Sequence, residues 1–218
     1  MKIAIDGPAG AGKSTVAKEI AHQLGILYID TGAMYRALAW KGLQQGIDFA
    51  NSPELEELAR CTAVHLENED EKLRVYCDGQ DVTSDIRTPE VSKWVSVVAA
   101  NPVVREEMVE QQQAIARHAD VVMDGRDITH CVLPDAEFKF FLTASIEERA
   151  QRRKLELDEK GYEVNLEELT NEIEERDRRD RERKVGPLKI TEDALVIDTS
   201  HMQSNEVIER VLKIVRGG

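Results

Sequence analysis

The stretch that decides the fold is Gly7-Pro8-Ala9-Gly10-Ala11-Gly12-Lys13-Ser14, which lies between a short apolar run at residues 3–5 and a helical pattern over residues 16–24. It is a complete GxxxxGK[ST] motif in the strand, loop and helix setting that a phosphate-binding loop (P-loop) requires. Glycines let successive backbone N–H groups point inward, and the following helix presents its positive end to phosphate. The sequence therefore predicts a nucleoside triphosphate site at these residues and Thr15, rather than an ordinary glycine-rich turn.

Three side chains at the end of this loop have predicted roles. Lys13 should bridge the β and γ phosphates, Ser14 should bind Mg²⁺ through its hydroxyl, and Thr15 should donate to a further phosphate oxygen. Asp124 ends a predicted strand that faces the loop, so it is a candidate either for Mg²⁺, through a water molecule, or for capping the turn that follows it. We therefore expect Mg²⁺ to accompany the triphosphate.

Apolar runs of strand length alternate with longer helical patterns along the rest of the chain. They lie at residues 3–5, 26–29, 121–123, 138–142 and 195–197 and are nearly free of charge. Strands buried on both faces have this composition, and alternation with helices implies right-handed crossovers in a parallel sheet. We expect an α/β fold of three layers around a parallel five-stranded sheet.

Two regions interrupt this alternation. Residues 51–102 indicate a short helix near Ser52, a hairpin formed by residues 63–67 and 73–77, a polar turn at 78–81, and a helix from Pro89. Residues 145–184 are dense in charge and indicate two exposed, mobile helices broken near Gly161. We expect a single domain over residues 1–218, with a core of 1–50, 102–144 and 185–218, an insert of about 51–101 and a lid of about 145–184.

The overall charge narrows the class of partner. The 218 residues include 42 Asp and Glu against 29 Lys and Arg, a net charge of -13. Nucleic acid and anionic membranes would be repelled at long range, so neither is an expected partner, whereas local cations can still hold a small anion. Because no apolar stretch is long enough to cross a bilayer and the first residues lack a signal-peptide apolar region, the expected location is the cytoplasm.

The cysteines indicate no cross-linked or metal-bound framework. Cys61, Cys77 and Cys131 are odd in number, widely spaced and form no CxxC pair. This pattern argues against a set of disulfides and against a zinc site. We expect reduced thiols that are mostly buried.

A second group of polar residues is suited to an anionic acceptor. The segment from Asp30 to Arg36 follows the second predicted strand, and the segment from Asp124 to Asp127 follows the third, at the edge where open α/β sheets bind ligands. The charged helix carries Arg176, Asp180 and Arg183 at spacings of four and three residues, which places them on one face. Arg149, Arg152 and Arg153 form a similar group. Taken alone, these patterns are also typical of surface ion pairs and solvated helix faces.

Together these residues closely resemble the bacterial cytidylate kinases, a branch of the nucleoside monophosphate kinases, over essentially the whole chain. The shared motifs are IDGPAGAGKST, DTGAMYR, IRTPEVS with NPVVRE beyond it, DGRDI, LPDAEFKFFLTAS, and ERDRRDR before Pro187-Leu188. The resemblance implies a P-loop kinase fold with an insert in the monophosphate-binding region and a helical lid. It also implies transfer of the ATP γ-phosphoryl group to CMP or dCMP, by a monomeric enzyme of pyrimidine nucleotide metabolism.

The resemblance implies roles for individual residues. Thr31, Arg105, Asp127 and Arg183 are expected at the cytosine or phosphate of CMP, Arg36 and Arg126 at its phosphate, Ser96, Arg176 and Asp180 at its ribose, and Tyr35 in the wall of the pocket. Arg149, Arg152 and Arg153 correspond to lid arginines that close over the triphosphate, with Arg152 among the ATP-binding residues. The expected catalytic residues are Lys13, Arg126, Arg149, Arg153 and Arg183.

One segment departs from the family pattern. Where members usually read Ile-Gly-Thr-Val-Val after Gly-Arg-Asp, this chain has Ile128-Thr129-His130-Cys131-Val132. Loss of the glycine is expected to change the turn beside Asp127 and to place an imidazole near the pocket. We expect no catalytic role for His130, because phosphoryl transfer between phosphates needs no strong base.

Other functions of a P-loop remain as alternatives. The nearest is a kinase for another small acceptor, such as UMP, AMP or a compound that is not a nucleotide. A GTPase switch would need a guanine-reading Asn/Thr-Lys-x-Asp segment, which the sequence lacks. A nucleic-acid ATPase is disfavoured by the acidic charge balance and by the absence of a basic and aromatic patch.

Overall fold

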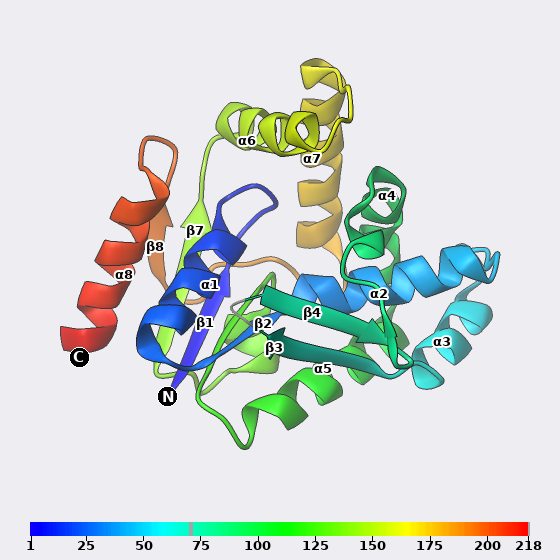
Figure 1. Cartoon of the computed structure of the whole chain (residues 1–218), viewed down its shortest axis with the longest axis horizontal. Coiled ribbons are helices and arrows are strands. Elements are labelled where there is room, and N and C mark those ends of the chain that lie inside the picture. The colour runs from blue at the N-terminus through cyan, green and yellow to red at the C-terminus, as the bar shows by residue number, and fades with distance from the viewer. Residues whose placement is uncertain (70–71, 218) are drawn as a thin grey trace.

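The computed structural model describes residues 1–69 and 72–217, and its centre is a parallel β-sheet (Figure 1). In this part of the chain the sheet has five strands: β1 (Lys2–Asp6), β2 (Leu27–Asp30), β6 (Val121–Gly125), β7 (Phe138–Thr143) and β8 (Leu195–Asp198). Their order is β2-β6-β1-β7-β8, and each neighbouring pair is parallel. Each strand falls on one of the predicted apolar runs, so the predicted sheet is confirmed.

Both faces of the central strands β1 and β6 are covered, which explains why these strands are mainly apolar, whereas the edge strand β8 is largely exposed. In β1, Ile3 and Ile5 belong to one apolar cluster and Ala4 to another, and all three are fully buried. This alternation follows from the period of two in a strand. The first cluster includes α1 (Lys13–Leu24), α2 (Thr31–Gln44) and α8 (Ser204–Gly217); the second includes α5 (Pro102–Ala116). The result is a three-layer α/β structure.

A small antiparallel sheet packs against α2 beside this core, and the helices α3 (Ser52–Arg60) and α4 (Pro89–Val98) precede and follow it in the chain. Strands β3 (Val64–Glu69) and β4 (Lys72–Cys77) pair as the predicted hairpin, whose two connecting residues lie outside the described part of the chain. The sequence predicts only a turn at 78–81. The structure shows that Asp78 and Gly79 complete the reversal with positive φ, so that β5 (Gln80–Asp81) pairs with β4.

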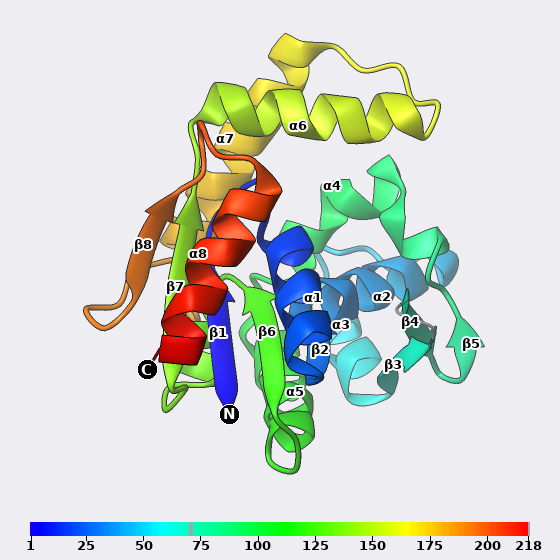
Figure 2. The same ribbon diagram turned by 60° about the vertical axis from the view of Figure 1, so that its left-hand side comes forward.

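Two charged helices, α6 (Ile146–Glu159) and α7 (Leu166–Glu182), lie above the carboxyl edge of the central sheet (Figure 2). We call them the lid helices. Ser145 and Asn165 cap their first turns, and the predicted break between them contains Gly161 at a φ of 81°. The lid helices share their own apolar cluster, made by Ala150, Leu157, Leu169 and Ile173 with Val164. The division of the chain into core, insert and lid stays a prediction.

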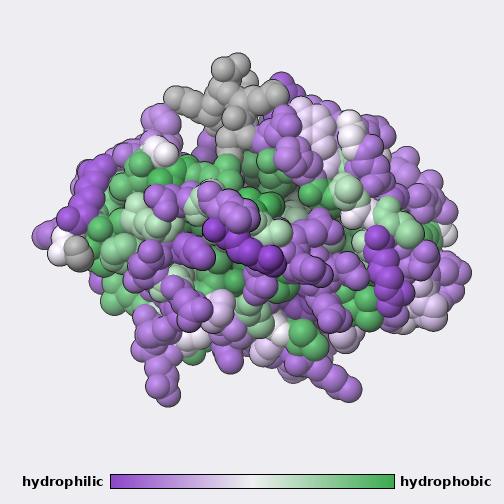
Figure 3. All heavy atoms as spheres, turned by 90° about the horizontal axis from the view of Figure 1, so that it is seen from below, coloured by the Kyte–Doolittle hydropathy of each residue, from purple (hydrophilic) through white to green (hydrophobic). Residues whose placement is uncertain are grey.

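The surface opposite the lid helices is largely hydrophilic, with hydrophobic residues between the polar ones (Figure 3). All three cysteines are free; Cys77 is buried and Cys131 half-buried, but Cys61 is exposed because it follows the last turn of α3 on the surface. Within the described residues, no group of three or more His, Cys, Asp or Glu side chains is placed to hold a metal ion. None of the helices described is long and apolar enough to span a membrane.

Leu157→Ala should loosen the lid helices and leave the core intact. Leu157 is 3% exposed within the lid cluster, and loss of a buried leucine side chain typically costs about 2 to 5 kcal/mol. Because this cluster is separate from those of the core, we expect faster amide hydrogen exchange across residues 146–182 and unchanged exchange in β1 and β6. Leu155→Ala, at a residue 64% exposed on the same helix, is the control. Equal acceleration in the central sheet would contradict the independence of the lid cluster.

Candidate active site

The predicted triphosphate and acceptor residues meet at the carboxyl edge of the central sheet. Asp6 at the end of β1 is in register with Gly125 of β6, and Asp30 at the end of β2 is in register with Asp124. The segments that follow these strands therefore start side by side, as is usual for ligand sites in open parallel sheets. Together with the lid helices they surround a cavity of about 1440 Å³.

Most of the predicted site residues line this cavity. They are Ala9, Gly10, Ala11, Gly12, Lys13, Ser14 and Thr15 from the P-loop and α1; Thr31, Tyr35, Arg36, Arg105, Asp124, Arg126 and Asp127 from the core; Ser96 from α4 of the insert; and Arg152, Arg153, Arg176, Asp180 and Arg183 from the lid region. Gly7, Pro8 and Arg149 are not among the lining residues. The fold thus brings distant stretches of sequence into one site, and their roles toward nucleotides stay predictions.

Arg149 supports the P-loop from behind instead of pointing into the cavity. It is 2% exposed, and its guanidinium donates to the carbonyl oxygens of Ala9 and Ala144, each at 3.1 Å. It also pairs with Asp177 of α7 at 2.7 Å. In this arrangement Arg149 joins both lid helices to the loop, so any contact with a triphosphate would require it to leave these partners.

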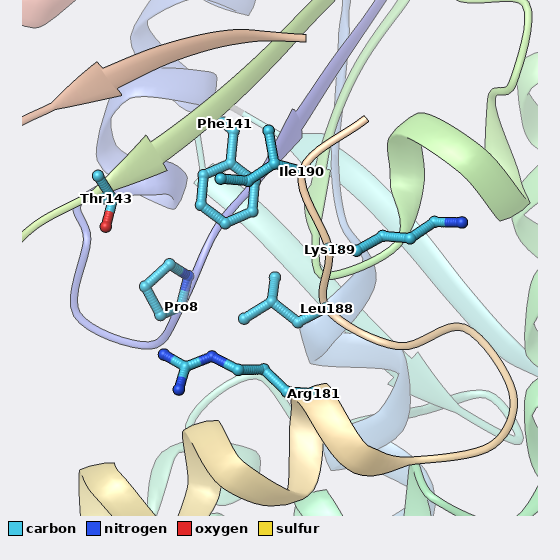
Figure 4. A pocket seen from close by; sticks show the side chains of 7 residues that line it. All are labelled: Pro8, Phe141, Thr143, Arg181, Leu188, Lys189 and Ile190. Atoms are coloured by element: carbon cyan, nitrogen blue, oxygen red, sulfur yellow. The ribbon is translucent and has the colours of Figure 1, made fainter. Parts of the chain in front are cut away.

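Gly7 and Pro8 face β7 on the other side of the loop. A Cβ atom at Gly7, whose φ is 150°, would collide with the carbonyl oxygen of Leu142, so only glycine fits there. The Pro8 ring lies in a smaller hollow of about 380 Å³, between Phe141 of β7 and the segment that contains Leu188 (Figure 4). These two residues therefore shape the loop, while the residues from Ala9 to Thr15 face the cavity.

Lys13 is the first residue of α1, and its buried ammonium group reaches back to the loop. It is 5% exposed, and its Nζ donates to the carbonyl oxygen of Pro8 at 2.7 Å. Burial, and then the nearby charge of Arg126, lowers the pKa of Lys13 to about 7. A phosphate group in the loop would raise this pKa again, because its negative charge favours the ammonium form.

Ser14 and Asp124 form a pair of oxygen donors beside Lys13. The Ser14 hydroxyl donates to Asp124 Oδ2 and the Tyr28 hydroxyl to Asp124 Oδ1, both at 2.9 Å. Burial and the charge of Asp30 raise the pKa of Asp124 to about 6. Hydroxyl and carboxylate oxygens are ligands that suit Mg²⁺, which binds a few protein groups together with substrate phosphates. The residues present therefore fit such an ion.

A buried ion-pair network forms the acceptor end of the cavity. Arg105 is 1% exposed and pairs with Asp127, whose Oδ1 lies 3.5 Å from Arg183 Nη2. The Arg105 guanidinium also lies 5.4 Å from the centre of the Tyr35 ring, a cation–π distance. Gly186 packs against this pair so closely that a Cβ there would collide with both partners. The network fixes a carboxylate and two guanidinium groups in one place.

Positive charge between the two ends of the cavity is not fully balanced. Arg126 pairs with Asp180 at 2.9 Å, but Nε of the adjacent Arg176 is buried and has no hydrogen-bond partner among the described residues. Burial and repulsion from Arg126 lower the pKa of Arg176 to about 9, and burial lowers that of Arg36 to about 10. Buried cations without a partner are costly, so this part of the cavity is suited to phosphate groups.

Sequence reasoning missed Ser92, and it placed Ser96 in the site without its contact to Arg179. Ser92 Oγ accepts from Arg36 Nη1 at 3.0 Å and from Arg153 Nη2 at 3.4 Å, and Ser96 Oγ accepts from Arg179 Nη1 at 3.0 Å. Through these bonds α4 contacts both lid helices. The spacing of Ser92 and Ser96, four residues apart on one helical face, is a signal that could have found them.

The segment that departs from the family pattern forms a single π-helical turn, Ile128–Val132, directly after Asp127. His130 is not among the residues that line the cavity. Its ring nitrogens are buried without a hydrogen-bond partner in the described structure, and burial lowers the pKa of the ring. The turn therefore places the imidazole behind Asp127, away from the space where a substrate would lie.

Comparison with known sequences assigns a family to this arrangement. A sequence model described as cytidylate kinase matches residues 3–217. The chain belongs to the cytidylate kinase family. It is 55% identical over 217 residues to a cytidylate kinase from Pelotomaculum thermopropionicum, a match that covers 99% of this chain and 96% of that protein. It is 52% identical to a bifunctional pantoate ligase/cytidylate kinase from a Synechococcus strain, of which the match covers 40%.

The solved structures share the fold at low sequence identity. The shikimate kinase from Bacteroides thetaiotaomicron matches with a TM-score of 0.51 and 12% identity, over 99% of this chain and 98% of that one. At this identity the likeness concerns the fold alone. It confirms the predicted P-loop kinase arrangement of helices around a parallel sheet.

Binding of ATP at about pH 8 should be accompanied by uptake of a proton, because Lys13 is largely uncharged above its pKa of about 7 and a bound triphosphate raises that pKa. The proton uptake should vanish at low pH, where Lys13 is already protonated before ATP binds. Calorimetric titrations in buffers of different ionisation enthalpy measure the uptake. Lys13→Met should abolish it, and Lys18→Met, at an exposed lysine of the same helix, should preserve it. Uptake that is absent in the unaltered chain would contradict the assignment of a depressed pKa to Lys13.

Proposed function

We propose that this chain transfers the γ-phosphoryl group of ATP to CMP or dCMP, giving ADP and CDP or dCDP. The observation that carries the proposal is the single cavity that has a P-loop at one end and the Asp127, Arg105 and Arg183 network at the other. Between them lie arginines whose positive charge and hydrogen-bond donors are not fully paired, such as Arg176. A donor triphosphate and an acceptor monophosphate would place their charged ends in that middle region.

The acceptor end has the chemistry to recognise cytosine. The base offers one amino donor next to two ring acceptors. A carboxylate such as Asp127 accepts from an amino group, while a guanidinium such as Arg105 or Arg183 donates to the ring acceptors. Uracil carries a carbonyl oxygen in place of the amino group, so it would set an acceptor against the Asp127 carboxylate. CMP and dCMP are therefore favoured over UMP.

The chemistry requires positioning more than proton transfer. The attacking phosphate oxygen of the acceptor is already ionised, so the protein has to bring two polyanions together and stabilise charge on the transferred group. Lys13 would exchange the Pro8 carbonyl for a phosphate oxygen. Arg126, Arg153 and Arg183 line the same space, and Arg149 would hold the loop. When bound, Mg²⁺ would be held by Ser14 and, through water, by Asp124, and would neutralise charge on the triphosphate.

The lid helices would exclude water during transfer. Arg152 and Arg153 of α6 and Arg176 of α7 already line the cavity. Arg152 also donates a hydrogen bond to the hydroxyl of Thr199, which directly follows β8. Water in the closed site would hydrolyse ATP, so closure over both substrates favours transfer over hydrolysis. The two helices share one apolar cluster of their own, and the contacts to the core described above are polar, so the helices can move as a unit once those contacts are exchanged for substrate.

Turnover with different acceptors tests the proposal. ADP formation from ATP and Mg²⁺ would be followed with CMP, dCMP, UMP, AMP or no acceptor. We expect the highest kcat/KM with CMP or dCMP, a lower value with UMP because of the Asp127 carboxylate, and little turnover with AMP. Faster turnover of AMP than of CMP, or ADP formation that is independent of acceptor, would contradict the proposed function.

Lys13→Ala should lower kcat by about two to three orders of magnitude, because loss of a group that stabilises transition-state charge typically costs this much. Folding should be retained, since removal of a buried, desolvated cation relieves the repulsion from Arg126. Steady-state kinetics and thermal unfolding measure the two effects. Lys18→Ala, at an exposed lysine of α1, should leave kcat unchanged. A Lys13→Ala protein with near-normal turnover would remove the P-loop from the reaction.

A further inference from the structure

Asp6 is a fully buried carboxylate at the end of β1, outside the lining of the cavity. It accepts three hydrogen bonds, all from one short segment. The backbone N–H groups of Ile128 and Thr129 donate to it at 2.9 Å each, and the Thr129 hydroxyl donates at 2.7 Å. These are distances of well-formed hydrogen bonds. The carboxylate therefore holds one turn at three points.

The turn held by Asp6 follows directly on the acceptor end of the cavity. Asp127 is the residue before Ile128, and Arg126 precedes it. Asp127 pairs with Arg105, and Arg126 with Asp180 of α7. A displacement of the turn backbone would shift both Arg126 and Asp127 relative to these partners. The orientation of the two side chains therefore depends on the hydrogen bonds that Asp6 accepts.

Asp6 also connects this turn to the P-loop. The next residue is Gly7, which packs tightly against the backbone of β7 and so fixes the start of the loop. The charge of Asp6 acts on Lys13, where it opposes the lowering of the pKa by burial. Burial raises the pKa of Asp6 itself to about 6, against the opposing effect of the bonds from Thr129 and Ile128. At neutral pH the carboxylate is therefore ionised and can accept all three hydrogen bonds.

We propose that Asp6, through its bonds to Ile128 and Thr129, is a positioning residue that fixes Arg126 and Asp127 for recognition of the acceptor nucleotide. The proposal rests on the proposed function. We call the three hydrogen bonds from Ile128 and Thr129 to Asp6 the clamp. Because Asp6 acts through the turn and not by contact with a substrate, loss of one of these bonds should weaken acceptor binding and leave donor binding unchanged. The Thr129 hydroxyl is the part of the clamp that can be removed with least disturbance.

Thr129→Val tests the clamp, since valine keeps the branched shape and removes the hydroxyl donor. We expect the KM for CMP to rise about fivefold to tenfold, while kcat and the KM for ATP stay within about twofold. Thr129→Ser, which keeps a hydroxyl, should restore most of the affinity for CMP. In the protein without nucleotide, the amides of Ile128 and Thr129 should exchange faster in Thr129→Val. Asp6→Asn should raise the KM for CMP more strongly, but it also removes a charge that acts on Lys13, so its effect on ATP is not part of the test. The Thr129 series decides if Asp6→Asn does not fold.

Thr62→Val is a matched control. Thr62 is 4% exposed, its hydroxyl donates to the Leu58 carbonyl at 2.5 Å, and it does not line the cavity. It should lower the Tm and leave both KM values unchanged. A Thr129→Val protein with an unchanged KM for CMP, or with equal rises in both KM values, would overturn the proposal. A wild-type protein that forms no ADP from ATP and CMP would instead refute the proposed function. In that case the rates of amide hydrogen exchange at Ile128 and Thr129 would still test the clamp.

Discussion

Desolvation of half-buried guanidinium groups, reinforced by their mutual repulsion, is the constraint on which the site depends. Arg36, Arg126 and Arg176 act on one another strongly enough that burial and this repulsion together lower the pKa of Arg176 to about 9. Asp180 and Asp127 compensate part of the charge by pairing with Arg126 and Arg105. The positive charge that is left unpaired lowers the stability of the empty protein, and a bound polyanion would remove this cost. Relief of this cost on binding adds to the affinity of the site for phosphate.

The same constraint explains how an acidic protein can take anionic substrates. The net charge of -13 is spread over the chain, and exposed charges are screened over about 8 Å at physiological ionic strength. The guanidinium groups of the cavity are buried or half-buried, where screening is weaker. The electrostatic potential that an entering nucleotide meets is therefore set by local arginines rather than by the acidic exterior.

Local sequence patterns were sufficient for much of the fold. Apolar runs that are nearly free of charge predict all five strands, and the strand, loop and helix setting predicts the P-loop. Burial on both faces accounts for this composition in β1 and β6, whereas Leu195 and Val196 of the edge strand β8 are each 42% exposed. Helical spacing also places Arg176, Asp180 and Arg183 on one face, and all three line the cavity.

Side-chain direction across element boundaries could not be predicted in the same way. Arg149 belongs to the arginine group expected over the triphosphate, yet it turns inward to the Ala9 carbonyl and Asp177, because α6 packs on the loop at that residue. Asp6 looks like the start of the P-loop motif in the sequence, and only the register of β1 beside β6 brings it to Ile128 and Thr129. β5 depends likewise on pairing with β4, which a two-residue strand cannot signal alone.

The proposed function requires one cavity to hold donor and acceptor nucleotides with their phosphates facing each other across Arg36, Arg126 and Arg176. A bisubstrate analogue, in which adenosine and cytidine are joined through five phosphates, tests it most directly by calorimetric titration. We predict that this analogue binds at least about a hundredfold more tightly than ATP or CMP alone, because the second nucleotide binds with the entropy cost already met. We also predict that Arg176→Met removes much of the gain. An analogue that binds no more tightly than ATP would contradict the shared cavity.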